Sequence, residues 1–483
     1  MPSVSPPPSE PLRRSGSAVA LGLCLLTVLL QATNFVVDWK QLALRPGFTV
    51  NYDVVVGDNG HYFGIARNLL LGRGYTDSTP EIMTVRPGEP TYVRTPGMPL
   101  LYTLPLLLFC RDTGYEVTEE NVSLVWLALF LVNLGLLSLG AVYFGKLCQL
   151  VLSDARLGVL GGVLYVVWPS HLVFLSPALT KFTPETIVAP LVVLVCYLLL
   201  SRQPAVSSGL VGGLLLGYCL LTRVYLVLLP VVLLAASVFI GDRLMRRRIW
   251  LVVLISTLVF LPWPVRNYLV FHDFAPSSQG GILLWFGNNA EARGSIDGRM
   301  YDEGLANPEK FPLLAELERK YPGLVQLHRY SETEAKAILQ REALAWMKAN
   351  PASLVRLWAR KLAITFYPAN FGTSSPNVLT AGVLVLFVPG LLLYLWHWRR
   401  GGAPADFAVL ALPILVGCLV NVLFFAEYRT RMVMEPFMIL FALYALRQGL
   451  AWMGLATQGG YSGVGAAEGV GAGRSAGRPR MWQ

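Results

Sequence analysis

Long runs of apolar residues, almost free of charge, recur along the whole chain and limit the folds open to it. A helix needs about 20 apolar residues to cross a bilayer, whereas the strands of a membrane barrel alternate apolar and polar residues. Because these runs are continuous, the sequence predicts an all-α polytopic membrane protein with about 10–11 transmembrane helices. The ten long runs are 17–37, 121–150, 157–176, 185–201, 208–222, 224–241, 249–264, 378–397, 405–425 and 432–452.

Composition supports this class. Only 14% of the 483 residues are charged and 54% are hydrophobic, whereas soluble domains carry about 25% charged residues. The net charge of +10 is expected to come from cytoplasmic loops rather than from a nucleic-acid surface. The six cysteines lie in or beside apolar runs without a CxxC pair, which favours buried thiols over a disulfide or metal framework.

Basic clusters predict the orientation of the chain in the membrane. Arg13 and Arg14, "DRLMRRR" (242–248) and "HWRRGG" (397–402) are expected on the cytoplasmic side. Ten spans satisfy these clusters and leave both termini in the cytoplasm, provided that 207–241 is two helices and not one long tilted helix. The stretch 98–110 reaches only about 20 Å as a helix, so we expect it to be re-entrant or docked against the bundle from outside.

These boundaries predict a multi-pass protein of the cell (inner or plasma) membrane. The large outer loop shows helix signals, because Ser331 and Glu334 match a capping box and Asn350-Pro351 is typical of a helix start. The predicted parts are a cytoplasmic segment 1–16, a transmembrane module 17–264 with a first outer loop 38–97, an extracytoplasmic loop 265–375, transmembrane helices 376–452 and a disordered cytoplasmic tail 453–483.

The stretch "GDNGHYFGIARNLLLGRGY" (57–75) follows the first span and is the most informative polar segment. Apolar residues from Tyr62 onward recur at helical spacing and predict a short amphipathic helix near the membrane surface. Asp58 precedes that helix, where it is either a helix cap or a functional carboxylate. His61 is a candidate base or ligand, although a lone surface histidine is more often neither.

Other polar residues gather at the predicted outer ends of spans. Outward arginines oppose the usual cytoplasmic bias and suggest binding of an anion, for which a lipid phosphate fits a guanidinium; snorkelling to headgroups is the alternative. Lys181 and Glu185 are either functional or a simple i,i+4 pair. No nucleotide, serine-hydrolase or zinc-protease motif occurs in a credible context, and no metal site is predicted. The further candidates are Arg94, Arg266, Asn267, Asn288, Asn289, Arg429 and Arg431.

The order of "IARNLLLGRGY", "RTPGMPLL", "LTKFTPETI", "PWPVRNYLVF", "GNNAEARG" and "YRTRMVMEP" resembles that of the family-39-like glycosyltransferases over about 20–450. These are multi-span relatives of protein O-mannosyltransferases and of the aminoarabinose transferase acting on lipid A. The resemblance implies a GT-C-type helical fold, a polyprenyl-phosphate-linked sugar donor and transfer to a lipid, glycan or protein acceptor on the outer face.

The resemblance also assigns expected roles. Asp58 matches the catalytic acid of the first outer loop, and Glu185 matches a second acid at the mouth of a later span. Arg266, and with it Arg94, Arg429 and Arg431, matches arginines that bind the donor phosphate. Many relatives carry two adjacent acids where this chain has Asp58-Asn59, so a divalent metal is not favoured, and Asp53 is an alternative acid.

Two other functions are compatible with the sequence. A transporter or flippase for lipid-linked saccharides would carry polar residues through the middle of several spans. Because the predicted spans are nearly free of charge, the sequence favours an enzyme. A non-catalytic assembly subunit of a cell-envelope glycan pathway is the second alternative, since the tandem acid is missing.

Overall fold

The structure is a computed structural model. It describes residues 10–43, 58–77, 88–174, 183–201, 203–240, 242–295, 307–325, 329–369, 376–400 and 404–454. Two of the predicted residues, Asp53 and Lys181, lie outside these ranges. Within them the chain is helical, with two isolated β-bridges and no strand. The expected all-α class is therefore confirmed.

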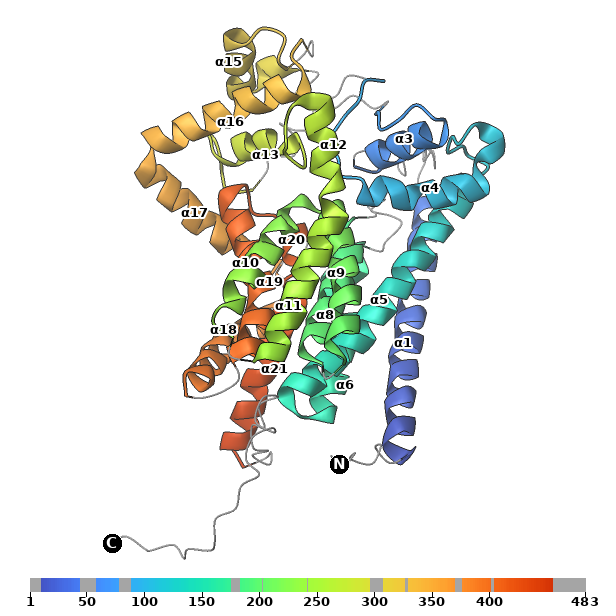
Figure 1. Cartoon of the computed structure of the whole chain (residues 1–483), viewed down its shortest axis with the longest axis vertical. Helices are drawn as coiled ribbons and strands as arrows, with labels where there is room; N and C mark the ends of the chain where they lie inside the picture. The colour runs from blue at the N-terminus through green and yellow to red at the C-terminus, as the bar shows by residue number, and fades with distance from the viewer. Residues whose placement is uncertain are drawn as a thin grey trace, which may run out of the picture.

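Ten helices form the bundle and correspond to the ten apolar runs (Figure 1). Five segments are long and apolar enough to cross a membrane: Val122–Leu152, Ala205–Thr222, Arg243–Phe271, Val378–Arg399 and Asp406–Leu423. Many leucines and valines on the outside of the bundle are exposed, as expected for a surface that faces lipid. The ten are α1 (Glu10–Ala43), α5 (Val122–Leu152), α6 (Ala155–Val166), α8 (Glu185–Leu200), α9 (Ala205–Thr222), α10 (Leu228–Ser237), α11 (Arg243–Phe260), α18 (Val378–Arg399), α19 (Pro404–Leu423) and α21 (Glu435–Trp452).

One apolar run differs from the predicted helix, and one uncertain stretch is resolved. The run 157–176 is not one helix, because α6 ends at Val166 and a short α7 (Pro169–Phe174) follows; a proline disfavours helical backbone at the residue before it. The run 207–241 is broken at Arg223 into α9, a 3₁₀ turn (Val224–Val227) and α10. The expectation that this stretch forms two helices is therefore confirmed.

The two ends of the bundle are different in character (Figure 1). We call the end at which α1 begins and α21 ends the basal end. The opposite, apical end carries the helices of the two regions that the sequence predicts to be outer loops, and we keep the name outer regions for them. Those are α3 (Asp58–Leu70) and α4 (Gly97–Phe109) from the first region, and α12 (Pro262–Phe271), α13 (Gln279–Gly287), α15 (Pro312–Lys320), α16 (Glu332–Ala349) and α17 (Pro351–Thr365) from the second.

Helix α4, the short apolar stretch, lies across the end of the bundle and not parallel to its helices (Figure 1). It packs against α3, α5 and α9. A Cβ atom on Gly97 would overlap Thr222 Oγ1 at the end of α9, so the close approach of the two helices requires glycine there. This arrangement agrees with a segment docked on the bundle.

The second outer region has its own small hydrophobic core between α13, α15 and α16. The predicted capping box is confirmed: Ser331 Oγ accepts from the Glu334 amide, and the Glu334 carboxylate accepts from the Ser331 amide. Helix α17 begins at Pro351, as predicted, and buries Leu354 and Leu357 while Val355 is exposed. The described part of this region is thus a helical unit with its own core at the apical end of the bundle (Figure 1).

Candidate functional site

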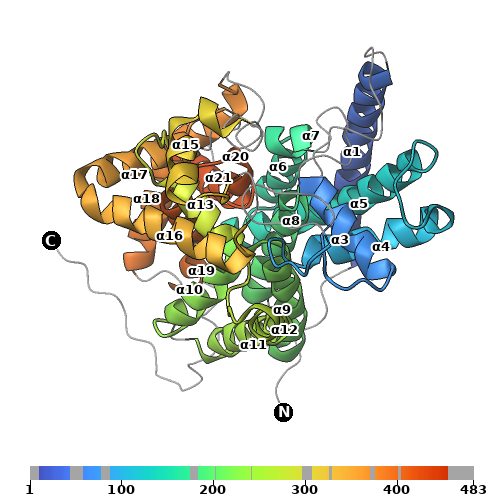
Figure 2. The same ribbon diagram turned by 90° about the horizontal axis from the view of Figure 1, so that it is seen from above.

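Three acids and three arginines meet at the apical end from widely separated parts of the sequence. Viewed from above, α8 lies between α3 and the short helix α20 (Tyr428–Arg431) (Figure 2). Helix α3 begins at Asp58, α8 begins at Glu185, and α20 carries Arg429. The remaining charged residues of this cluster, which we call the apical charge cluster, are Arg94, Arg223 and Glu427.

Helix α3 is fixed by packing on α4. Tyr102 of α4 contacts the rings of Tyr62 and Phe63 edge-on, at centroid distances of 5.7 and 4.5 Å. Its hydroxyl donates to Asn59 Oδ1 at 2.8 Å. The N-terminus of α3, and with it Asp58, is therefore held at a defined place beside the ends of the bundle helices.

Asp58 binds two guanidinium groups at once. Its Oδ1 lies 2.9 Å from Arg94 Nη2, and its Oδ2 lies 3.1 Å from Arg429 Nη1. Burial raises the pKa of the Asp58 carboxyl, but the charges of Arg94 and Arg429 outweigh it and hold that pKa below its usual range. The Asp58 side chain is 29% exposed, so solvent or a ligand can still reach the ionised carboxylate.

The other two acids are paired in the same cluster. Arg223 Nη2 lies 2.8 and 2.9 Å from the two oxygens of Glu185. Arg429 donates through Nε and Nη2 to Glu427 Oε1, at 3.0 and 2.8 Å. Arg429 is thus shared between two carboxylates. The six formal charges of the cluster cancel, three against three.

Tyr62 lies within the electrostatic field of these pairs. Burial raises the pKa of its hydroxyl to about 12, with a further contribution from the negative charge of Asp58, while Arg223 and Arg94 act in the opposite direction. Tyr62 is therefore a neutral hydrogen-bonding group beside the ionised cluster.

Arg94 is positioned by the second outer region. Glu332 of α16 accepts from the Thr91 hydroxyl and, at 3.2 Å, from the Tyr92 amide. Ser277 Oγ donates to the Val93 carbonyl at 2.7 Å, and Tyr75 Oη donates to the Arg94 carbonyl at 3.0 Å. The segment that carries Arg94 is therefore held by side chains from both outer regions.

Arg266, the expected phosphate ligand, belongs to this same clamp. Its Nη1 donates to the Thr91 carbonyl at 2.9 Å and to Asn267 Oδ1 at 3.1 Å. Its guanidinium lies 5.1–5.5 Å from three aromatic ring centroids, those of Tyr75, Trp263 and Phe271. In this structure Arg266 closes the two outer regions together and does not contact Asp58.

Arg431 is also set apart from Asp58. It is fully buried, and its Nε lies 2.9 Å from Glu435 Oε1. Its Nη1 and Nη2 donate to the carbonyls of Tyr367 and Ala369 at 2.6 and 2.8 Å. These contacts fix α20, so Arg431 supports the neighbouring Arg429 instead of facing the cluster.

The predicted asparagines and histidine lie in local networks. Asn267 and Asn289 donate to the carbonyls of Ala275 and Trp285, each at 2.9 Å. Asn288 donates to the Leu423 carbonyl and accepts from the buried Lys361. His61 Nδ1 lies 2.6 Å from the buried Asp77 Oδ2. Asn267, Asn288 and His61 hold neighbouring segments together, whereas Asn289 contacts the last turn of its own helix, α13.

Sequence reasoning missed Arg223, Glu427 and Glu332. Arg223 had a usable signal, since it is a charge that interrupts two apolar runs at a predicted outer turn. Glu427 stands directly before "YRTR" but was not singled out. Among the described residues, no group of three or more His, Cys, Asp or Glu residues is placed to hold a metal ion.

No protein-family model matches the sequence, and no curated protein matches it. Solved structures do share the fold. The archaeal oligosaccharyltransferase AglB from Archaeoglobus fulgidus, in complex with an inhibitory peptide and a dolichol-phosphate, is 15% identical, with a TM-score of 0.53 over 92% of this chain and 52% of that chain. AglB tethered to an acceptor peptide containing the NVT sequon gives 0.52 at 15% identity, over 91% and 50%.

ArnT from Cupriavidus metallidurans bound to undecaprenyl phosphate is 16% identical, with a TM-score of 0.37 over 87% of this chain and 77% of that chain. The chain spans about half the length of AglB. The likeness to AglB shows that the chain has the GT-C-type fold of a membrane glycosyltransferase, which confirms the fold expected from the sequence.

Proposed function

We propose that the chain is a membrane glycosyltransferase that transfers a sugar from a polyprenyl-phosphate-linked donor to an acceptor on the extracytoplasmic face. The observation that carries this proposal is Asp58 held between Arg94 and Arg429 at the apical end. An ionised carboxylate suits a base, and guanidinium groups suit a phosphate. The fold adds support, because AglB has been solved with a dolichol-phosphate.

The proposed reaction is a displacement at the anomeric carbon of the sugar. The oxygen of the acceptor hydroxyl forms a bond to that carbon, and Asp58 takes the proton from the hydroxyl. The bond from the carbon to the phosphate oxygen breaks, and polyprenyl phosphate leaves with the bonding electrons. Arg94 and Arg429 stabilise the negative charge that develops on the phosphate. Glu185 holds Arg223 beside these groups.

The charges of the cluster already balance one another before a substrate binds. This balance implies an order in which donor and acceptor bind. Both arginines already contact Asp58, so a donor phosphate must take over part of their hydrogen bonding. That exchange frees a carboxylate oxygen for the acceptor proton. It also makes Asp58 a stronger base, because the negative phosphate offsets the charge of the arginines and so raises the pKa of the carboxyl. The donor therefore binds before the acceptor.

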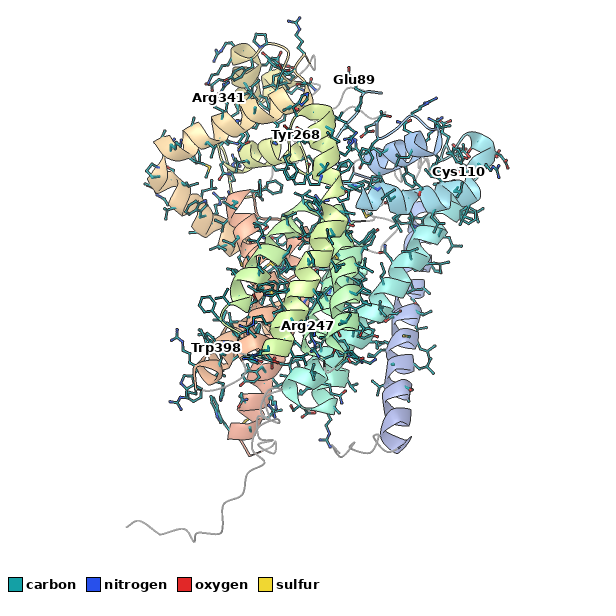
Figure 3. All side chains as sticks on the ribbon, in the orientation of Figure 1. Glu89, Cys110, Arg247, Tyr268, Arg341 and Trp398 are labelled. Atoms are coloured by element: carbon teal, nitrogen blue, oxygen red, sulfur yellow. The ribbon has the colours of Figure 1, made fainter. Side chains whose placement is uncertain are left out.

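The orientation follows from the basal end, where Arg247 lies (Figure 3). Basic residues accumulate on the cytoplasmic side of membrane proteins. The proposal therefore places the basal end and both termini in the cytoplasm of a cell-membrane protein, with the apical charge cluster outside. Because the cluster lies at helix ends and not at the middle of the spans, the geometry favours an enzyme over a flippase.

The test uses the full chain in lipid with a panel of radiolabelled polyprenyl-phosphate sugars, comparing wild type with Asp58→Asn. Loss of the general base should lower transfer by about 100-fold or more. Binding of polyprenyl phosphate should be retained or become tighter, because the variant no longer competes for the two arginines. Glu342→Gln, which disrupts an exposed pair with Lys320 on α16, is the matched control and should transfer normally.

Full transfer by Asp58→Asn would remove Asp58 from the reaction. If the wild type binds a donor but turns over none of the panel, an assembly subunit becomes the better assignment. Movement of labelled lipid across the bilayer without sugar transfer would instead identify a flippase.

A further inference from the structure

The basal end holds a cavity of about 280 Å³ between α5, α8 and α9, near the ends of α8 and α9 that lie opposite Glu185 and Arg223. Arg248 shapes its rim by donating to the carbonyls of Leu199, Ser201 and Gln203, which fixes the turn between α8 and α9. The side chains that matter for the argument are Tyr143, Lys146, Tyr197, Gln203, Ser208 and Val211.

The cavity has a cation available for a ligand. Lys146 Nζ lies 4.7 Å from the centroid of the Tyr143 ring, and Tyr143 packs edge-on against Tyr197. No carboxylate in the described part of the chain pairs with Lys146. The ammonium group is thus held at the cavity by aromatic contact, with its hydrogen-bond donors free for an anion.

The cavity also contains an unpaired hydroxyl. Ser208 is 2% exposed, and its Oγ makes no hydrogen bond among the described residues. A buried hydroxyl without a partner is unfavourable, and because Ser208 lines the cavity, a small reorientation of its side chain would let a polar ligand satisfy it. Gln203 adds an amide at the rim. These groups match the oxygens of a phosphate.

The polarity of the walls changes along the helix axis. Lys146 and Gln203 lie near the basal ends of α5 and α8, whereas Val211 lies about two turns along α9 from its basal start and is 45% exposed. Leu210 and Leu214 continue this exposed apolar face. The surroundings therefore fit a ligand with an anionic head and apolar tails that follow α9 into the hydrocarbon.

We propose that this basal cavity binds the anionic headgroup of a membrane phospholipid from the leaflet at the basal end. The site does not depend on the proposed transfer reaction. Free phosphate presents the same anionic oxygens but lacks the tails that would cover Val211 and the exposed leucines, so it should bind far more weakly than the lipid.

The experiment measures lipid retained by the purified full chain after exchange into vesicles of phosphatidylcholine with or without phosphatidylglycerol, followed by detergent extraction and native mass spectrometry. Wild type should retain phosphatidylglycerol in preference to phosphatidylcholine. Lys146→Gln should weaken that retention about tenfold, because one charge-assisted hydrogen bond is lost. Lys146→Arg should restore it, and Ser208→Ala should weaken it by a smaller factor.

Lys320→Gln, a lysine of the apical region that is exposed and paired with Glu342, is the matched control and should retain lipid like the wild type. Thermal unfolding of each variant checks that it is folded. Equal retention by Lys146→Gln and wild type would overturn the proposal, as would equal retention of the two lipids. Displacement of the lipid by inorganic phosphate at comparable concentration would show a free-phosphate site instead.

Discussion

The apical and basal ends of the molecule both carry arginines, but the arginines contact different partners. At the apical end Arg94, Arg223 and Arg429 each lie within 3.1 Å of a carboxylate. At the basal end Arg247 is exposed, and Arg400 stacks on Trp396 at 3.9 Å. The arginines at the two ends therefore differ in whether they pair with a carboxylate.

Under the proposed orientation, the exposed basal arginines are explained by the bias of positive charge toward the cytoplasm, which needs charge but no particular partner. The apical arginines are not, because partly buried ion pairs lose hydration that their mutual attraction only partly returns. A protein can keep such a cluster for a function that uses its charges. The comparison thus predicts large functional effects at one end and small ones at the other.

Substitution of Arg429 should cause the largest loss of sugar transfer after substitution of Asp58 itself. Arg429→Gln removes the guanidinium that joins Asp58 to Glu427, and loss of one group that stabilises a developing oxyanion costs about 100-fold or more. Arg429→Lys keeps the charge but cannot reach both carboxylates in the same geometry, so it should fall between Gln and wild type. Steady-state kinetics should place the loss mainly in kcat.

The control for Arg429 is Arg341→Gln, an exposed arginine of α16 beside Tyr321, at the upper edge of Figure 3. It should transfer at the wild-type rate. Equal losses in the two variants would mean that any apical arginine matters only for general stability, and the comparison between the two ends would lose its basis.

Glu332→Gln should have a smaller effect, because Glu332 acts on the cluster through the backbone that carries Arg94. The variant loses one of the two carboxylate oxygens that hold Thr91 and Tyr92. We expect roughly a tenfold lower transfer rate from a slightly displaced arginine. Glu342→Gln changes the same residue type on the same helix and should leave the rate unchanged; parallel behaviour of the two would rule out this positioning role.

The sequence was sufficient for the bundle because span length depends on local apolar content alone. Ten apolar runs correspond to ten helices, and the stretch 207–241 forms two helices, as the predicted topology required. The division of 157–176 at Pro169 was missed because the runs were judged by hydropathy, which does not register the backbone restriction imposed by proline.

Only part of the candidate site could be predicted from the sequence. Asp58, Arg94, Glu185 and Arg429 were selected by their expected position at outer helix ends, and the structure brings them together. Their pairing was not predictable, since Asp58 and Arg429 are 371 residues apart. The role of Arg266 stays a prediction, because a side chain that joins two loops has the same local sequence signature as one that binds a ligand.

At acid pH we expect a smaller effect, on thermal stability, that reports on the ion pairs of Asp58 with Arg94 and Arg429. A carboxyl whose pKa is lowered on folding stabilises the fold above its unfolded pKa, near 4, and this contribution is lost as pH falls through the folded pKa. The Tm difference between wild type and Asp58→Asn should therefore stay constant from about pH 7 to pH 5 and shrink below about pH 4. A difference that changes around pH 6 would point to another titrating group.

The smallest effect is expected at the basal end. Arg247→Gln removes an exposed charge at the start of α11 and leaves the neighbouring Arg248, which holds the α8–α9 turn, in place. Because several basic residues share the orienting role, transfer, Tm and membrane orientation should all match the wild type within error. A loss of transfer comparable to that of Arg429→Gln would show that the basal arginines also take part in function, and the distinction between paired and unpaired arginines would then fail.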